Sequence, residues 1–128
     1  MRITNHKLIY ISITFLLGVL TCTSSYALTV CDGTYSVSDA AGIAAISVCN
    51  EITGNLTIDS ETLTNLSGLE NLQTVGGNLY IRDNTSLVSL TGLNNLTTVA
   101  ETVIIDSNPV LASLSALSSL AGTVFFLY

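Results

Sequence analysis

The sequence predicts a mainly β fold: a leucine-rich-repeat-like or β-helical solenoid of about three and a half coils behind a small N-terminal cap. An alternating apolar phrase begins at residues 54, 77, 101 and 122, so successive copies start 23, 24 and 21 residues apart. A row of leucines, three residues apart, follows each of the first three phrases. One such unit cannot bury its apolar face alone, so we expect stacking of the copies 54–76, 77–100, 101–121 and a partial copy 122–128.

Each phrase is expected to form a short, half-buried strand, because apolar residues occupy every second position. The inward positions are Leu56 and Ile58, Leu79 and Ile81, Val103 and Ile105, and Val124 and Phe126. The outward positions become more apolar toward the C-terminus: Thr57, Tyr80, Ile104 and Phe125. An exposed apolar row on a solenoid sheet marks either a binding face or a surface that further sequence covers.

The leucine row of each coil predicts extended or 3₁₀-like turns, because a spacing of three is too tight for a sustained α-helix. Gly68 and Gly92 interrupt the first two rows, and Ala116 stands at the same place in the third. That bend therefore cannot strictly require a positive φ in every coil. Val75 and Val99 close the first two coils.

Two asparagines, Asn84 and Asn108, follow the second inward strand position by three residues. Their amides could bind buried backbone groups of the neighbouring coil and form a ladder. The first copy has Glu61 at this place, so the ladder would start at the second coil. The alternative is that both are surface turn residues.

The N-terminal segment has the layout of a secretory signal peptide over residues 1–27. Arg2 and Lys7 precede a largely apolar stretch, 8–20, and the segment ends in Ser-Tyr-Ala with Ala27 last. That stretch is shorter than the ~20 residues needed to span a bilayer, so a retained anchor is the weaker interpretation. Lipid attachment at Cys22 is the other alternative.

Cleavage after Ala27 would leave 101 residues, one small domain, with nine carboxylates and Arg82 as the one cation, a net charge of −8. Such a surface repels phosphate backbones, which excludes nucleic acid as a partner. We expect a secreted or cell-surface protein, in the periplasm or on the outer surface if the source is bacterial.

Residues 28–53 are predicted to form the N-terminal cap. Cys31 and Cys49 are the thiols left after cleavage, and an even pair in an exported chain predicts a disulfide worth about 3 kcal/mol. Ser38 and Asp39 precede an apolar segment, 40–46, which predicts a capped helix with Ile43 and Ile46 inward. No histidine follows residue 27, so we expect no metal site.

Two segments resemble the receptor L-domain family: Val48-Cys49-Asn50-Glu51-Ile52-Thr53-Gly54-Asn55-Leu56-Thr57-Ile58 and Leu66-Ser67-Gly68-Leu69-Glu70-Asn71-Leu72. This module occurs in the insulin and epidermal growth factor receptor ectodomains, and in fungal wall and bacterial surface proteins. The resemblance implies a right-handed coil with parallel sheets and a role in recognition rather than chemistry. No ligand-contact residues carry over. A full domain of this family has more coils and a closing cap, which implies that the chain is a fragment.

Catalysis is not expected, because the segment after residue 27 has no histidine or lysine for acid–base or nucleophilic chemistry, and no cofactor is expected. Asp59 and Asp106 fall in one column about 10 Å apart with Arg82 between them, which favours a charge ladder. The alternative class is a secreted carbohydrate-active or calcium-dependent protein that uses surface carboxylates.

The predicted binding residues are Tyr80, Arg82, Ile104 and Asp106, which alternate with buried positions on adjacent strands. Tyrosine and arginine most often dominate binding energy, so we expect a protein or glycan ligand here. The alternative is that these side chains only steady the sheet. The C-terminal edge, where nothing covers Val124 and Phe126, is expected to support self-association.

Overall fold

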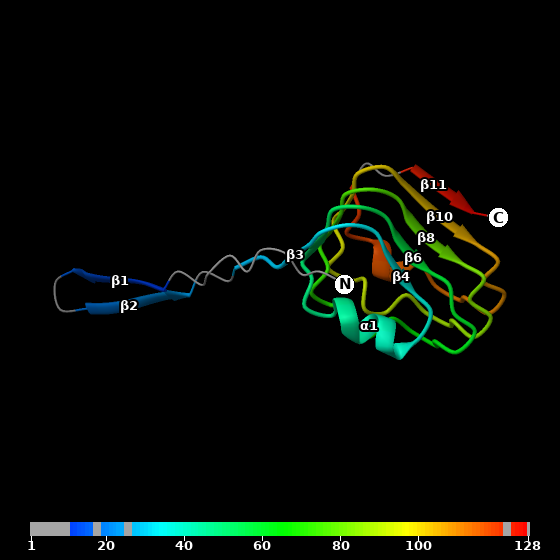
Figure 1. Cartoon of the computed structure of the whole chain (residues 1–128). Helices are drawn as coiled ribbons and strands as arrows, with labels where there is room; N and C mark the ends of the chain where they lie inside the picture. Colours follow the sequence, from blue (N-terminus) through cyan, green and yellow to red (C-terminus); the bar gives the residue numbers. More distant parts are fainter. Residues whose placement is uncertain (1–10, 17–18, 25–26, 122–123, 128) are drawn as a thin grey trace.

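The computed structural model describes residues 11–16, 19–24, 27–121 and 124–127, and it is a β-solenoid of about three turns (Figure 1). The elements are β1 (Ile11–Leu16), β2 (Val19–Ser24), β3 (Val30–Cys31), β4 (Tyr35–Val37), α1 (Ala40–Ile46), β5 (Glu51–Ile52), β6 (Leu56–Ile58), β7 (Thr74–Val75), β8 (Leu79–Arg82), β9 (Thr98–Val99), β10 (Thr102–Asp106), the 3₁₀ helix η1 (Ser115–Leu117) and β11 (Val124–Leu127). Among these described segments, no helix is long and apolar enough to cross a bilayer.

The strands form two parallel sheets and one hairpin. The larger sheet has the order β11-β10-β8-β6-β4, and the smaller one has the order β3-β5-β7-β9. β1 and β2 pair antiparallel in a separate two-stranded sheet, within the predicted signal peptide. Cleavage after Ala27 stays a prediction.

The larger sheet confirms the predicted alternation in the three described coils. Leu56 pairs with Leu79, and Leu79 pairs with Val103; the next inward column joins the three isoleucines Ile58, Ile81 and Ile105. All six side chains are buried, whereas the outward residues between them are half-buried. The interior is therefore one continuous apolar column running along the solenoid.

The smaller sheet is built from two-residue strands. Ile52 pairs with Val75, and Val75 pairs with Val99. The valines that close the first two coils are therefore buried residues of this sheet. No strand was predicted here, since two residues carry no detectable alternation.

The N-terminal cap adds one rung to each sheet. Tyr35 pairs with Leu56 and Val37 with Ile58, while Cys31 pairs with Ile52. The cap therefore continues the spacing of the coils although its sequence does not repeat them. The predicted helix is confirmed as α1, with the Asp39 side chain accepting the Gly42 N–H at 2.9 Å and with Ile43 and Ile46 buried.

The leucine rows form the predicted 3₁₀-like turns, in which the N–H of one leucine donates to the carbonyl of the leucine three residues earlier. These bonds are Leu69 to Leu66 at 3.2 Å, Leu93 to Leu90 at 3.1 Å and Leu117 to Leu114 at 2.9 Å. Gly68 and Gly92 have φ values of 113° and 116°, whereas Ala116 lies within η1. The third coil thus makes its bend without a positive φ at that position.

The pairing of β11 corrects one sequence prediction. β11 lies beside β10 as the expected further strand, but Thr102 pairs with Val124 and Ile104 pairs with Phe126. Alignment of the phrases had placed Phe125 beside Ile104. Phe126, not Phe125, is therefore the residue of β11 in register with Ile104 and Tyr80.

Gly92 provides a test of how closely the coils approach. A methyl group there would overlap the carbonyl oxygen of Leu66 in the preceding coil, and its φ is positive. We expect Gly92→Ala to lower the free energy of unfolding by about 3 kcal/mol or more, measured by urea denaturation. Gly33→Ala is the matched control, because Gly33 has a φ of 103° but open space around its Cα, and we expect about 1–2 kcal/mol. Equal losses in the two variants would contradict the close approach.

Candidate functional site

The four predicted binding residues form one cluster on the outward face of the larger sheet. Tyr80 on β8 pairs with Ile104 on β10, and Arg82 pairs with Asp106. Tyr80, Ile104 and Asp106 are half-buried, whereas Arg82 is exposed. The structure therefore brings all four together in a two-by-two arrangement, which we call the sheet-face cluster.

Arg82 lies over the ring of Tyr80 within this cluster, with 5.8 Å from the guanidinium carbon to the ring centroid. This is a cation–π contact between residues two apart on one strand. The predicted column of Asp59, Arg82 and Asp106 is in register, since Asp59 follows Ile58 as Arg82 follows Ile81. The arginine thus lies over an aromatic ring and stands in register between two aspartates.

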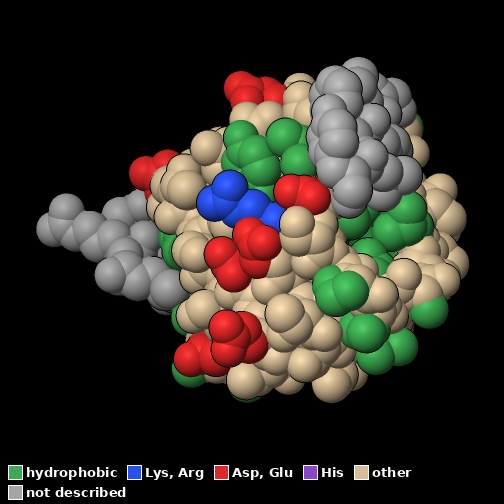
Figure 2. All heavy atoms as spheres, turned by 90° about the vertical axis from the view of Figure 1, so that its right-hand side faces the viewer, with side chains coloured by type: hydrophobic (Ala, Val, Ile, Leu, Met, Phe, Trp, Pro, Cys, Tyr) green, Lys and Arg blue, Asp and Glu red, His purple; other side chains and the backbone are tan. Residues whose placement is uncertain are grey.

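Figure 2 shows one cationic side chain with acidic side chains on either side of it. It belongs to Arg82, the one lysine or arginine among the described residues. Hydrophobic side chains gather beside it on the same face. The face therefore offers an aromatic ring, an aliphatic side chain and both signs of charge.

The strands end at a bend that the Asn84 side chain stabilises from inside. Asn84 is fully buried, and its Nδ2 donates to the carbonyl oxygens of Ile58 at 3.0 Å and Arg82 at 2.9 Å. Its Oδ1 accepts the N–H of Ser60 at 2.9 Å. One side chain therefore joins the end of β8 to the bend of the coil before it.

Asn108 repeats this role one coil further along and confirms the predicted ladder. Its Nδ2 donates to the carbonyl oxygens of Ile81 and Asp106, both at 2.8 Å, and its Oδ1 accepts from Asn84 Nδ2, also at 2.8 Å.

The first coil corrects the prediction that Glu61 occupies this column. The inward residue is Ser60, which is 2% exposed, and Glu61 is exposed. Asp83 and Ser107 explain the offset. Each is an extra residue with a positive φ, 56° and 54° respectively, and the first coil has no residue at this place. The side-chain amides of the ladder start at Asn84 in the second coil, as predicted, and Ser60 receives them through its backbone N–H.

A second polar ladder runs along the opposite ends of the strands and was missed. Asn55 Oδ1 accepts the N–H of Asn78 at 2.7 Å, and Asn78 Oδ1 accepts the N–H of Thr102 at 3.1 Å. The Thr34 hydroxyl continues it into the cap by accepting the N–H of Asn55 at 3.2 Å. The sequence does carry a signal for it, since Gly-Asn-Leu occurs in two consecutive phrases. The two ladders hold β8 and its neighbours at both ends.

An acidic depression of about 610 Å³ lies beyond the bends, lined by Asp59, Glu61, Asp83, Thr85, Ser107, Asn108 and Pro109. Within the described ranges, no three or more His, Cys, Asp or Glu side chains gather in a way that could hold a metal ion. The carboxylates of Asp59, Glu61 and Asp83 in this depression add negative charge beside the sheet-face cluster.

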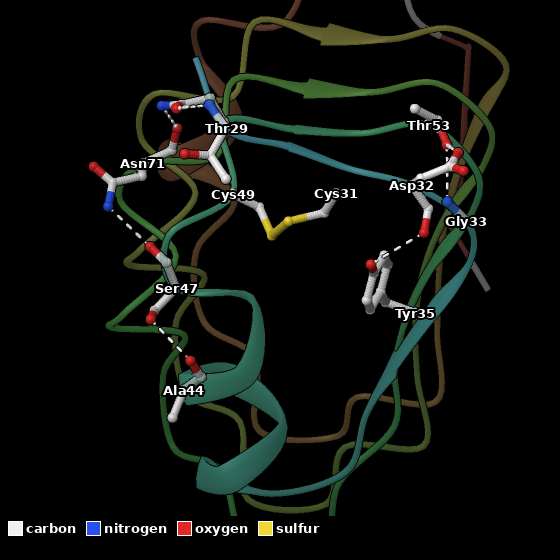
Figure 3. The surroundings of a disulfide bond; sticks show 11 residues. Thr29, Cys31, Asp32, Gly33, Tyr35, Ala44, Ser47, Cys49, Thr53 and Asn71 are labelled. Carbon is white, nitrogen blue, oxygen red and sulfur yellow. Dashed lines mark hydrogen bonds between the residues drawn. A yellow bond between two sulfur atoms is a disulfide. The ribbon is translucent and has the colours of Figure 1, made fainter. Parts of the chain in front are cut away.

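The disulfide of the cap lies inside the first rung, as Figure 3 shows. Cys31 on β3 is bonded to Cys49, with a Cα–Cα distance of 5.7 Å, and both are buried. Asn71 of the first coil donates to the carbonyl oxygen of Ser47 at 2.8 Å, just after α1. These contacts attach the cap firmly to the coils that carry the cluster.

The parallel rungs, the leucine turns and the disulfide-bonded cap define a leucine-rich-type β-solenoid module with no recognisable catalytic constellation among its described residues. The family described as Receptor L domain matches residues 48–121, more than half of the chain, and the chain belongs to this family. No curated protein matches the sequence. Membership places the chain among cell-surface ligand-binding modules, a class without catalytic activity.

The buried ladder makes a quantitative prediction. Asn84→Ala would leave backbone polar groups of Ile58, Ser60 and Arg82 without their partner. We therefore expect the free energy of unfolding to fall by about 3 kcal/mol or more. The measurement is equilibrium urea unfolding.

Asn65→Ala is the control for this substitution, because Asn65 is exposed and binds only near its own turn. We expect it to cost about 1 kcal/mol or less. Equal free energies of unfolding for the two variants would contradict a structural role for the ladder.

Proposed function

We propose that the chain is an exported recognition module that binds a protein or glycan ligand through the sheet-face cluster. The observation that carries this proposal is the cluster itself: Tyr80, Arg82, Ile104 and Asp106 stand together on paired strands. Aromatic and arginine side chains on a pre-ordered surface lose little conformational entropy when they bind. Receptor L domains are ligand-binding modules, which supports the same role.

The strands that carry the cluster are held at both ends, which supports a role for it as an ordered binding face. Both ladders fix the strands beneath it, so the face is ordered before any ligand arrives. The charges on it alternate along one column, Asp59, Arg82 and Asp106, and this pattern favours a partner that carries both hydrogen-bond donors and acceptors.

Three features support the proposed export: the signal-peptide layout of residues 1–27, the Cys31–Cys49 disulfide and the family. Disulfides persist in oxidising compartments. We further propose that copies of the chain can associate through the C-terminal edge of the larger sheet, where β11 is the outermost described strand.

Binding can be tested with the double variant Tyr80→Ala/Arg82→Ala, screened with the unchanged protein on arrays of glycans and extracellular protein domains. We expect at least about tenfold weaker binding to any shared ligand, because both anchors are removed, with the melting temperature unchanged. Val88→Ala is the control, since Val88 is 50% exposed and lies in a leucine-side turn outside the larger sheet. A double variant that melts early yet binds normally per folded molecule would show that the cluster only steadies the sheet.

Export can be tested by intact-mass analysis of material secreted by an expressing cell. We expect loss of residues 1–27 and a mass lower than that of the reduced chain by two hydrogen atoms, because the two thiols are oxidised to a disulfide. Two alkylatable thiols, or a lipid adduct on Cys22, would refute this.

A further inference from the structure

Four Asn-x-Ser/Thr triplets occur in the sequence, and they begin at Asn55, Asn65, Asn84 and Asn95. This triplet is the acceptor sequence for N-linked glycans on surface loops of secreted proteins. Attachment requires two groups: the side-chain amide nitrogen of the asparagine, and the hydroxyl group of the residue two positions later. The contacts of these two groups therefore distinguish the triplets from one another.

The triplet at Asn84 is fully engaged in the fold. Asn84 is 0% exposed, and its Nδ2 donates to the carbonyl oxygens of Ile58 and Arg82. The hydroxyl group of Ser86 donates to the Glu61 carbonyl oxygen at 2.7 Å. A sugar on Asn84 would have to lie in the interior and would displace these bonds, so a glycan there is incompatible with the stacked coils.

The triplets at Asn95 and Asn55 also make contacts between coils. Asn95 Nδ2 donates to the Glu70 carbonyl oxygen at 2.7 Å, and the hydroxyl group of Thr97 donates to the Gln73 carbonyl oxygen at 3.2 Å. Asn55 is half-buried in the second polar ladder, where its Oδ1 accepts a backbone N–H of the next coil. Each of these triplets therefore helps to hold neighbouring coils together.

The triplet at Asn65 differs from the other three. Asn65 and Ser67 are both exposed, and among the described residues neither side chain bonds to another coil. Asn65 Oδ1 accepts the Ser67 N–H at 3.0 Å, which forms an Asx-turn within the triplet. Asn65 Nδ2 has one long contact, 3.4 Å, with the hydroxyl group of the adjacent Thr64. Replacing a hydrogen of this nitrogen by a sugar would therefore break no bond between coils.

The surface beside Asn65 has room for a sugar. Asn65 borders a groove of about 510 Å³ between α1 and the first leucine turn, and every residue that lines the groove is uncharged. The groove combines the methyl groups of Ala40 and Ala44 with the hydroxyl groups of Thr62 and Thr64. A neutral sugar can lie there without burying a charge.

We propose that Asn65 is the N-glycosylation site of the exported protein, and that folded molecules carry no glycan on the other three triplets. The donor is an oligosaccharide on a lipid diphosphate, supplied by a glycosylating secretory pathway. The bond from Asn65 Nδ2 to the first sugar carbon forms, and the bond from that carbon to the diphosphate oxygen breaks. The lipid diphosphate leaves, and the amide nitrogen gives up one proton. This proposal rests on the proposed export of the chain.

The test is intact-mass analysis and glycopeptide mapping of the protein secreted by mammalian cells, before and after treatment with a peptide N-glycosidase. We expect one glycan, which the enzyme removes while it converts the asparagine to aspartate. Asn65→Gln and Ser67→Ala should each abolish the glycan, because each removes one of the two required groups. Ser67→Thr keeps the hydroxyl group and should retain the glycan.

Asn95→Gln is the matched control, because it removes another triplet with an exposed asparagine and should leave the glycan unchanged. A version with the host's own signal peptide in place of residues 1–27 separates failed export from failed glycosylation. Thermal melting shows whether each variant is folded. The proposal is overturned by secreted protein without a glycan, by a glycan that persists in Asn65→Gln, or by folded protein with a glycan on Asn55, Asn84 or Asn95.

Discussion

Every coil of this solenoid must change direction at the end of a strand, and at that bend backbone N–H and carbonyl groups point into an interior that has no water to receive them. A buried polar group left without a partner costs roughly 1–3 kcal/mol, and several such groups occur in each coil. The Asn84 and Asn108 side chains solve this problem by binding the backbone of their own coil and of the coil before it. The apolar columns supply most of the driving force for folding, but they are equally apolar along their length. The ladder makes the register specific.

The outward face depends on that register. A shift of one residue in a strand exchanges its buried and exposed side chains, so Tyr80 and Ile104 stay side by side only while β8 and β10 keep their pairing. Asn84 holds the carbonyl oxygen of Arg82, the last residue of β8, and thereby fixes the strand end that carries the arginine. The interior polar network and the proposed recognition surface are therefore two sides of the same strands, which explains how so small a module can present an ordered face.

Much of the fold could be predicted from the sequence because local residue patterns determine most of its strands and turns. Alternation gave the inward columns, and Ser38-Asp39 before an apolar segment gave α1. The errors arose where pairing between coils, rather than the local pattern, determines which residues lie side by side. Counting from Ile58 selected Glu61 instead of Ser60, since the extra residue at Asp83 in the second coil changes the count. Similarity of the phrases placed Phe125 beside Ile104, but the pairing of a whole coil sets that register. The members of the sheet-face cluster were predicted from alternation; the stacking of Arg82 on Tyr80 depends on side-chain packing, which alternation does not specify.

The central claim is that side-chain amides in the interior lock the coils in register, and amide hydrogen exchange followed by NMR tests it most directly. The Ser60 N–H lies in a bend and donates to Asn84 Oδ1, while the Leu56 N–H donates to the Asn78 carbonyl oxygen within the larger sheet. If the ladder is intact in solution, the Ser60 amide exchanges about as slowly as that of Leu56, because both open only when the coils separate. Rapid exchange at Ser60 beside a protected Leu56 would show that the bend opens independently of the sheet, and would contradict the account.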